Sequence, residues 1–398
     1  MKVDPYKRDA LWKLYFISGG FICLIYWNTI INLAEYFSAT ISRNGFNLMT
    51  FSFCFGSIVS FFTGPIVFAR LSHKTALNFG IISSVMFFFL TLYTCECTED
   101  AALNQSLTVG TSFIFGYFSS FVQSKITGMA SEISNQELVY FNFGTGVAGV
   151  SSNMLAYFAT RIYPVQNDES DLSVLRQQVL LNVAIITALF VAYFATQYHF
   201  DKHNPEVLLF EGDREIENIL TETSMIDTAQ SAGEITIIRK SLDLLLSLTY
   251  LYICTIVIVA LFNIQAYFNF DRNQTAYTIP MYSFFFNVFD TIGKFLPSQF
   301  LIKSTALIQS LNGFRSIIPI YFYFILHYAS APELTSAYLR ILANIVLGFS
   351  NGYFSNSLMM MATNRFHKSL EKGKAAYFSI LFLYLGIVTG TFINVLLP

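Results

Sequence analysis

Long apolar stretches, separated by short polar clusters, recur along the whole chain. Each stretch is about 20 residues long, and 20 helical residues rise about 30 Å, which matches the hydrocarbon thickness of a bilayer. A barrel strand would instead alternate apolar and polar residues over about ten positions. The pattern therefore predicts an all-α, polytopic membrane protein of about eleven transmembrane helices. The predicted spans are Leu14–Phe37, Phe46–Ala69, Ala76–Cys95, Ser106–Lys125, Leu138–Thr160, Val179–Tyr198, Leu242–Phe268, Tyr277–Phe300, Ile308–Tyr328, Ala337–Ala362 and Ala375–Leu397.

Only one predicted connection between spans is long, the polar and acidic segment 199–240 between spans six and seven. It divides the chain into an N-terminal bundle of six spans (residues 1–198), a cytoplasmic linker, and a C-terminal bundle of five (residues 241–398). Two packed bundles that rock around a central site are typical of secondary transporters. The linker is interpreted as a solvated connection with a short amphipathic helix; a regulatory role is the alternative.

The Lys and Arg residues are distributed unevenly between the two sides of the predicted membrane. With the N-terminus in the cytoplasm, 17 of the 23 lie in inner segments, among them Arg315, and five lie in outer segments. Lys294 is left inside a span. Cytoplasmic loops carry the excess of positive charge in membrane proteins. The prediction is therefore a cytoplasmic N-terminus and, because the number of spans is odd, an extracellular Pro398.

Composition supports the membrane assignment and excludes some functions. Charged residues make up 12% of the chain, about half of the soluble average of about 25%, and the mean hydropathy is +0.52. The net charge of −2 provides no basic patch for nucleic acid. Cys95-Glu96-Cys97 has no nearby His or further Cys to complete a metal site. We expect no cofactor and no metal, and the first apolar stretch is expected to stay as a span rather than be cleaved as a signal peptide.

Two ionisable residues lie deep within one predicted span, Asp290 and Lys294. They are four residues apart and so share one helical face. Because a charge at the bilayer centre costs about 2.5–3.5 kcal/mol, we expect them to pair and to face a cavity. A pair that only fixes helix packing is the alternative. Glu35 lies near the outer end of span one, and Lys125 lies near the inner end of span four with Gln123 deeper in the membrane.

Small residues form a second pattern. Gly144, Gly146 and Gly149 reproduce the GxGxxG spacing of dinucleotide-binding loops, but they lie inside an apolar span without a preceding strand. Small residues in membrane helices let neighbouring backbones approach closely, so helix packing is the interpretation. Two sequons, at Asn104 and Asn273, fall on the predicted outside, and both loops are short for glycan attachment.

Several motifs resemble the equilibrative nucleoside transporter family. The stretch 286–295 is similar to its eighth-helix signature Asn-x-x-Asp-x-x-Gly-Arg, with Lys294 in place of the usual Arg. Residues 350–353 resemble the Ser-Asn-Gly-Tyr of its tenth helix. The further matches are Trp27, Asn28, Gln123, Gly144, Gly146, Gly149, Asn287, Asp290, Gly293, Arg315, Pro319 and Gly352.

The resemblance extends from the first to the last span and implies a fold like the major facilitator type with one helix fewer. It implies that Trp27 lines the pocket, that Gln123 hydrogen-bonds a base, and that Asp290, positioned by Lys294, accepts from ribose hydroxyls. Asn28 and Asn287 are either pocket contacts or helix braces. An ammonium does not bind oxygens bidentately as a guanidinium does, which favours free nucleobases somewhat more than in relatives with Arg.

The prediction is a facilitative transporter of nucleosides or nucleobases in the plasma membrane. We expect a monomer that binds lipid and a small-molecule substrate but no nucleic acid. A proton-coupled symporter of the same fold, with Asp290 or Glu35 titrating, is the alternative. A membrane-embedded enzyme is disfavoured because all five His residues lie at span ends or in loops.

Overall fold

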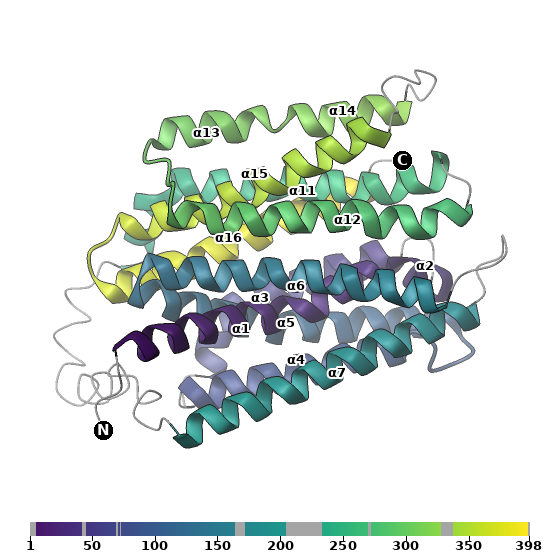
Figure 1. The fold of residues 1–398 in the computed structure, drawn as a ribbon, viewed down its shortest axis with the longest axis horizontal. Helices are drawn as coiled ribbons and strands as arrows, with labels where there is room; N and C mark the ends of the chain where they lie inside the picture. The colour runs from purple at the N-terminus through teal and green to yellow at the C-terminus, as the bar shows by residue number, and fades with distance from the viewer. Residues whose placement is uncertain are drawn as a thin grey trace.

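The computed structural model describes residues 5–41, 45–68, 71, 73–163, 172–203, 233–269, 272–327 and 337–396. Within these ranges the regular structure is entirely helical. The long helices lie side by side along the longest axis of the molecule, with the beginning of the chain at one end (Figure 1). This arrangement confirms the predicted all-α bundle.

The helices up to residue 203 form one side of the molecule, called the N-terminal half below (Figure 1). They are α1 Pro5–Asn32, α2 Ala34–Thr40, α3 Gly45–Val67, α4 His73–Thr94, α5 Ala101–Ile133, α6 Asn135–Ile162 and α7 Leu172–His203. The first predicted span is interrupted between α1 and α2. The Leu33 amide donates to the carbonyl oxygens of both Thr29 and Ile30, which tightens the last turn and ends α1.

The helices from residue 234 onward form the C-terminal half (Figure 1). They are α11 Glu234–Asn269, α12 Arg272–Phe295, η1 Leu296–Ser298, α13 Thr305–Phe314, α14 Ile317–His327, α15 Ala337–Asn364 and α16 Ser369–Leu396. Counting α1 with α2 and α13 with α14, the described residues provide the eleven predicted spans. The predicted linker 199–240 begins and ends within helices, and residues 204–232 lie outside the described residues, so the proposed domain boundaries stay a prediction.

Polar side chains at the starts of several helices explain where these helices begin. The Asp100 carboxylate accepts from the amides of Ala102 and Leu103 at 2.9 and 3.3 Å, which caps α5. Ser134 accepts from the Gln136 amide at 3.1 Å and caps α6. Such caps satisfy amides that have no partner within the helix. These caps place the starts of α5 and α6 several residues before the apolar stretches that were predicted as spans.

The ninth predicted span is broken at Arg315, which corrects its assignment to an inner segment. Pro319 has no N–H to donate to the carbonyl oxygen of Arg315, four residues earlier, and in a regular helix its ring would clash with that carbonyl. The chain therefore ends α13 at Phe314 and starts α14 at Ile317. The Arg315 side chain is only 4% exposed and lies between α11 and α15, so it does not belong to a cytoplasmic surface.

Close contacts between helices hold the two halves together. Within the N-terminal half α1 packs mainly on α6, and α3 and α4 pack on α5; within the C-terminal half α11 packs on α16 and α12 on α15. Between the halves, α6 packs on α12, and α16 packs on α5 and α3. These interfaces surround the centre of the molecule, where the polar residues of α5, α6, α12 and α15 gather.

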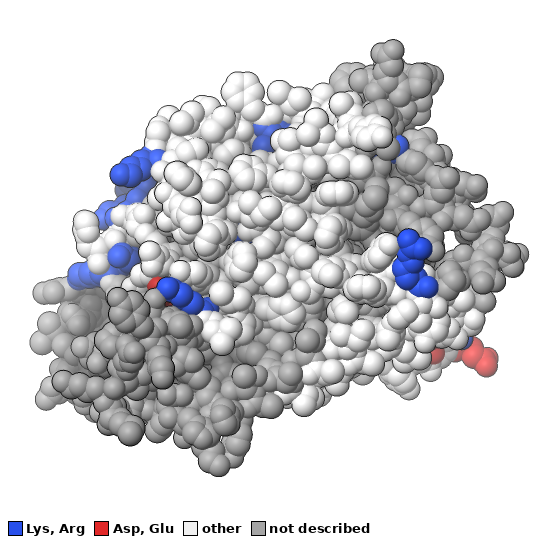
Figure 2. All heavy atoms as spheres, in the orientation of Figure 1, with Lys and Arg blue, Asp and Glu red and all other residues white. Residues whose placement is uncertain are grey.

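The outer surface is apolar around the middle of the bundle. Figure 2 shows a broad central band with almost no charged side chain, and most of the visible Lys and Arg side chains lie at the end where the chain begins. Large apolar side chains in the middle of helices, such as Phe55, Met86 and Val191, are 49%, 54% and 60% exposed. Among the described helices, five are individually long and apolar enough to cross a membrane.

Candidate functional site

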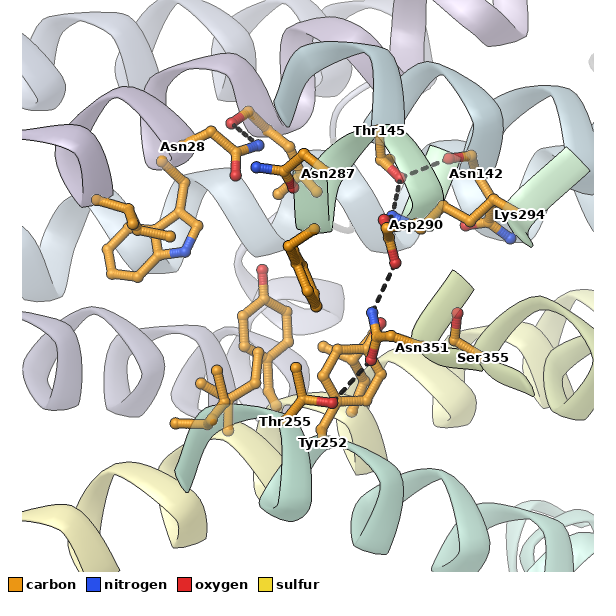
Figure 3. A pocket seen from close by; sticks show the side chains of 18 of the residues that line it. Asn28, Asn142, Thr145, Tyr252, Thr255, Asn287, Asp290, Lys294, Asn351 and Ser355 are labelled. Carbon is orange, nitrogen blue, oxygen red and sulfur yellow. Dashed lines mark hydrogen bonds and ion pairs between the residues drawn. The ribbon is translucent and has the colours of Figure 1, made fainter. Parts of the chain in front are cut away.

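A cavity of about 200 Å³ lies between the two halves near the middle of the bundle. A single water needs on the order of 15 Å³ of such space, so the cavity is large enough for a small organic molecule. Its lining combines aromatic rings, amides and hydroxyls from α1, α3, α5, α6, α11, α12, α15 and α16 (Figure 3). Among the described lining residues, only Asp290 and Lys294 carry a formal charge.

The Asp290 carboxylate and the Lys294 ammonium form an ion pair along one face of α12. Nζ of Lys294 is 2.7 Å from Oδ2 of Asp290, and the two side chains are 11% and 4% exposed, respectively. Nζ also donates to Oγ1 of Thr145 on α6 at 3.1 Å. Oδ1 of Asp290 accepts from Nδ2 of Asn351 on α15 at 2.7 Å. The buried charges are therefore neutralised within one helix, and each has a further hydrogen-bond partner on another helix.

A chain of hydrogen bonds continues from this pair across the C-terminal half (Figure 3). The Thr255 hydroxyl on α11 donates to Oδ1 of Asn351 at 2.9 Å. Nη2 of Arg315 donates to Oγ1 of Thr255 at 2.9 Å, and its Nε donates to the Ser350 hydroxyl at 2.8 Å. Arg315 thus supports the cavity from behind and fixes the Asn351 amide so that its nitrogen points to Asp290.

One pair of stacked aromatic rings lines the cavity from α1 and α3. The Trp27 indole stacks on the Phe53 ring, with centroids 4.0 Å apart and planes inclined by 15°. Asn28 also lines the cavity, and its Nδ2 donates to the Leu24 carbonyl of its own helix at 3.0 Å. Asn287 lines it from α12 beside Gly149. An aromatic platform next to amides suits a flat, polar ring.

Side chains that line the cavity also join the two halves by hydrogen bonds. The Tyr384 hydroxyl on α16 donates to Oε1 of Gln123 on α5 at 2.8 Å. Nδ2 of Asn142 on α6 donates to Oδ1 of Asn356 on α15 at 2.9 Å. Nδ2 of Asn356 in turn donates to the Lys294 carbonyl. Gln123 is therefore both a lining residue and a contact between the halves.

Comparison with known proteins adds an independent observation. Residues 109–398 match the family model described as nucleoside transporter. The chain belongs to the nucleoside transporter family. The equilibrative nucleotide transporter 1 of Arabidopsis thaliana is 22% identical over 408 residues, covering 96% of this chain and 84% of that protein.

Solved structures of similar fold are transporters of the major facilitator type, which confirms the predicted fold class. A D-xylose-proton symporter matches with a TM-score of 0.56 at 13% identity, covering 96% of this chain and 88% of that one. A bacterial homologue of the iron transporter ferroportin, in its outward-facing state, matches with a TM-score of 0.57 at 11% identity, covering 100% and 93%. The E. coli fucose:proton symporter matches with 0.54 at 13%, covering 96% and 95%. The cavity therefore lies within a fold similar to that of these transporters.

The glycines matched to the family lie where helices approach most closely. A Cβ added to Gly149 would lie 2.6 Å from the Asn287 side chain, and one added to Gly146 would lie 2.6 Å from the Thr291 hydroxyl, both on α12. Such contacts are too short for a side-chain carbon. Added carbons would also meet backbone oxygens of the facing helix within 2.4 Å at three further positions, Gly144, Gly293 and Gly352. The GxGxxG pattern is thus part of an interface that brings α6 onto α1 and α12.

Several predicted features lie away from the cavity. The Asn104 amide is 5% exposed and exchanges hydrogen bonds with the Thr98 backbone, so the folded chain buries this sequon. Lys125 lies two turns before the end of α5 rather than at a helix end, with its ammonium 5.8 Å from the Phe121 ring centroid. Glu96 of the Cys-Glu-Cys segment pairs with Arg176 at 2.6 Å. The side chains of Glu35 and Asn273 lie outside the described residues.

The structure places in the family's cavity polar residues that sequence reasoning did not select. Asn351, Thr145 and Thr255 contact or support the ion pair, and Tyr384 and Asn142 join the halves. The available signal was an asparagine or threonine within an apolar span, where an amide needs a partner. That signal does not distinguish cavity residues from helix contacts, because the partner lies on another helix far along the sequence.

Proposed function

We propose that this chain carries nucleosides or free nucleobases down their concentration gradient by alternating access to the central cavity. The observation that carries the proposal is the cavity between the two halves, which combines the Trp27–Phe53 stack with the Asp290–Lys294 pair in a member of the nucleoside transporter family. In this proposal Trp27 lines the base, Gln123 hydrogen-bonds it, and Asp290 accepts from the ribose hydroxyls while Lys294 positions it.

The charge of the cavity supports a neutral substrate. Asp290 and Lys294 offset each other, and the remaining described lining residues are uncharged. A nucleotide carries phosphate charge, which proteins bind with Arg or Lys or with helix N-termini. Lys294 is already paired, and Arg315 is bonded to Thr255, Ser350 and backbone carbonyls. A nucleoside or base is therefore the better fit, although the plant relative is named a nucleotide transporter.

The same geometry supports a uniporter over the proton-coupled alternative. The acid that lines the cavity has its counter-ion 2.7 Å away on the same helix and a second donor at 2.7 Å. The pair therefore stays together when the halves move, and a neutral substrate needs no ion to balance charge. We also propose a monomer in the plasma membrane with the N-terminus in the cytoplasm. Transport without chemical change of the substrate, rather than catalysis, completes the proposal.

Uptake of labelled adenosine, uridine and hypoxanthine into transport-deficient cells tests the proposed function. We expect saturable uptake above the vector control, no competition by adenosine monophosphate, and nearly unchanged initial rates with a protonophore. Loss of uphill accumulation with the protonophore would establish the symporter instead. No uptake of any of the three substrates by surface-delivered protein would refute the proposed function.

A further inference from the structure

Asn153 on α6 lines the cavity with an amide that has no partner. Its residue is 1% exposed. Neither Nδ2 nor Oδ1 has a hydrogen-bond partner among the described residues. Leaving a buried donor or acceptor unpaired costs about 1–3 kcal/mol each, so buried amides are almost always satisfied. Both polar atoms of this side chain are unpaired at once.

The other amides around the cavity show how unusual this is. On α1, Nδ2 of Asn32 donates to the hydroxyl of Ser152 at 3.1 Å. Ser152, the residue that precedes Asn153, therefore has a partner on α1. Five other asparagines that line the cavity each have a described hydrogen-bond partner: Asn28, Asn32, Asn142, Asn344 and Asn351. Asn287, the remaining lining asparagine, has no described side-chain hydrogen bond, but it is only half-buried. Among the described lining asparagines, Asn153 alone buries both polar atoms without a partner.

An unpaired amide presents one donor and one acceptor side by side in a plane. Its complement is a planar edge with an adjacent acceptor and donor, such as the N6–H and N7 of adenine that asparagine binds bidentately. Purines and pyrimidines have such edges, whereas an ion or an apolar molecule does not. The donor and acceptor of the Asn153 amide therefore match a nucleobase edge in polarity.

We propose that Asn153 is a specificity-determining residue that binds the donor–acceptor edge of the nucleobase. The proposal rests on the proposed function and adds a contact on α6 to those named above. Asn153 is eight residues beyond Thr145, the residue that holds Lys294, which corresponds to about 12 Å along α6. One ligand that contacts both Asn153 and the Asp290–Lys294 pair must be elongated, as a base joined to a sugar is.

The test combines deletion of the amide with deletion of single atoms on the ligand. Asn153→Leu keeps a similar volume and removes both polar atoms. The assay measures competition with uptake of labelled adenosine by unlabelled adenosine, N6,N6-dimethyladenosine, 1-deazaadenosine and 7-deazaadenosine. If uridine is the better substrate, N3-methyluridine competing with labelled uridine replaces these analogues. The matched control is Asn344→Leu, because Asn344 also lines the cavity but is bonded to the Arg340 carbonyl at 2.9 Å.

In the parent we expect the dimethyl analogue and one of the two deaza analogues to bind about tenfold more weakly than adenosine. In Asn153→Leu adenosine should lose about the same factor, and the analogues should then bind as well as adenosine does. Such coupling between two deletions identifies a direct contact. Equal analogue penalties in the parent and in Asn153→Leu would overturn the proposal, as would the same loss of coupling in Asn344→Leu.

A stability measurement separates a ligand contact from a structural role. Because the Asn153 amide has no hydrogen-bond partner among the described residues, purified Asn153→Leu should unfold at the same temperature as the parent or higher, and added adenosine should stabilise it less. A large loss of stability without ligand would show that Asn153 holds the fold together. Unchanged selectivity with raised stability would show that only water occupies the amide. Absence of uptake by the parent would refute the proposed function and this contact together, whereas uptake by the parent with unaltered Asn153→Leu selectivity would refute the contact alone.

Discussion

The Asp290–Lys294 pair provides the sharpest test of the site, because its structural and functional roles can be separated. Asp290→Asn keeps the shape of the side chain but removes its charge, leaving the Lys294 ammonium buried without a counter-ion. An amide nitrogen or oxygen then has to face Nζ at 2.7 Å while Asn351 still donates at 2.7 Å. Breaking a buried ion pair in this way costs about 3–5 kcal/mol. That cost is comparable to a large part of the total stability of a typical domain, about 5–15 kcal/mol.

We therefore expect Asp290→Asn to reach the cell surface poorly and to lose transport. The double variant Asp290→Asn with Lys294→Gln removes both charges, so it should recover folding and surface delivery, measured by surface biotinylation and size-exclusion profiles. It should still fail to transport, because the proposed acceptor of the ribose hydroxyls is absent. Normal transport by the double variant would show that the pair is only scaffolding and that the central site assignment is wrong.

Lys294→Arg tests the departure from the family's usual residue. It keeps the charge, and a guanidinium can hold the Asp290 carboxylate with two parallel hydrogen bonds. We expect surface expression like that of the parent, retained transport, and an altered ratio of riboside to free-base uptake. An unchanged ratio, measured with adenosine and hypoxanthine side by side, would contradict a role for residue 294 in substrate preference.

Three further predictions concern packing, pH and topology. In Gly352→Ala the new Cβ would lie 2.0 Å from a carbonyl oxygen of α12, so we expect about 1–3 kcal/mol of destabilisation in thermal unfolding. Gly110→Ala, also inside a helix but with nothing within 4 Å of the new Cβ, should instead stabilise by up to about 1 kcal/mol. Glu132 lies beyond the predicted span, and burial raises the pKa of its carboxyl from 4.5 to about 6. Between these pH values the folded state binds a proton that the unfolded state has released, so the free energy of unfolding should fall as the pH rises toward 6. Glu132→Gln should remove this pH dependence. A tag after Pro398 should react with impermeant reagents on intact cells and one in the 199–240 linker should not; the reverse would overturn the predicted orientation.

The number of spans and the ion pair were predictable because bilayer physics constrains both. A helix must be about 20 apolar residues long to cross, and a charge within such a helix needs a partner. Asp290 and Lys294 stood out for that reason and do pair. The ends of helices were less predictable, since caps such as Asp100 and Ser134 lie in water, where apolar length does not apply. The break at Arg315 depended on Pro319, whose effect on the backbone the apolar pattern conceals.

Contacts between the halves could not be predicted from spacing. Gln123 and Tyr384 are 261 residues apart, and Asn142 and Asn356 are 214 apart, so no local periodicity relates them. The sequence shows each as a single polar residue in an apolar span, which fits a helix contact, a cavity lining or both. Asn153 illustrates the limit, because only the absence of a partner in three dimensions distinguishes it from its neighbours.

The placement of strong and weak interactions agrees with a protein whose halves move relative to each other. The described ion pairs lie within one half: Glu96 with Arg176, Asp243 with Arg365, and Asp290 with Lys294. The polar contacts between the halves at the cavity are hydrogen bonds, from Tyr384 to Gln123, from Asn142 to Asn356 and from the Lys294 ammonium to the Thr145 hydroxyl. A neutral hydrogen bond contributes about 0.5–1.5 kcal/mol net because water replaces it when it breaks. Separating the halves at these contacts exchanges hydrogen bonds for hydration, while Asp290 and Lys294 keep each other as counter-ions because both lie on α12. A buried ion pair across the same interface would have to break in every cycle at several kilocalories per mole, whereas the Asp290–Lys294 pair, formed within α12, stays intact when the halves separate.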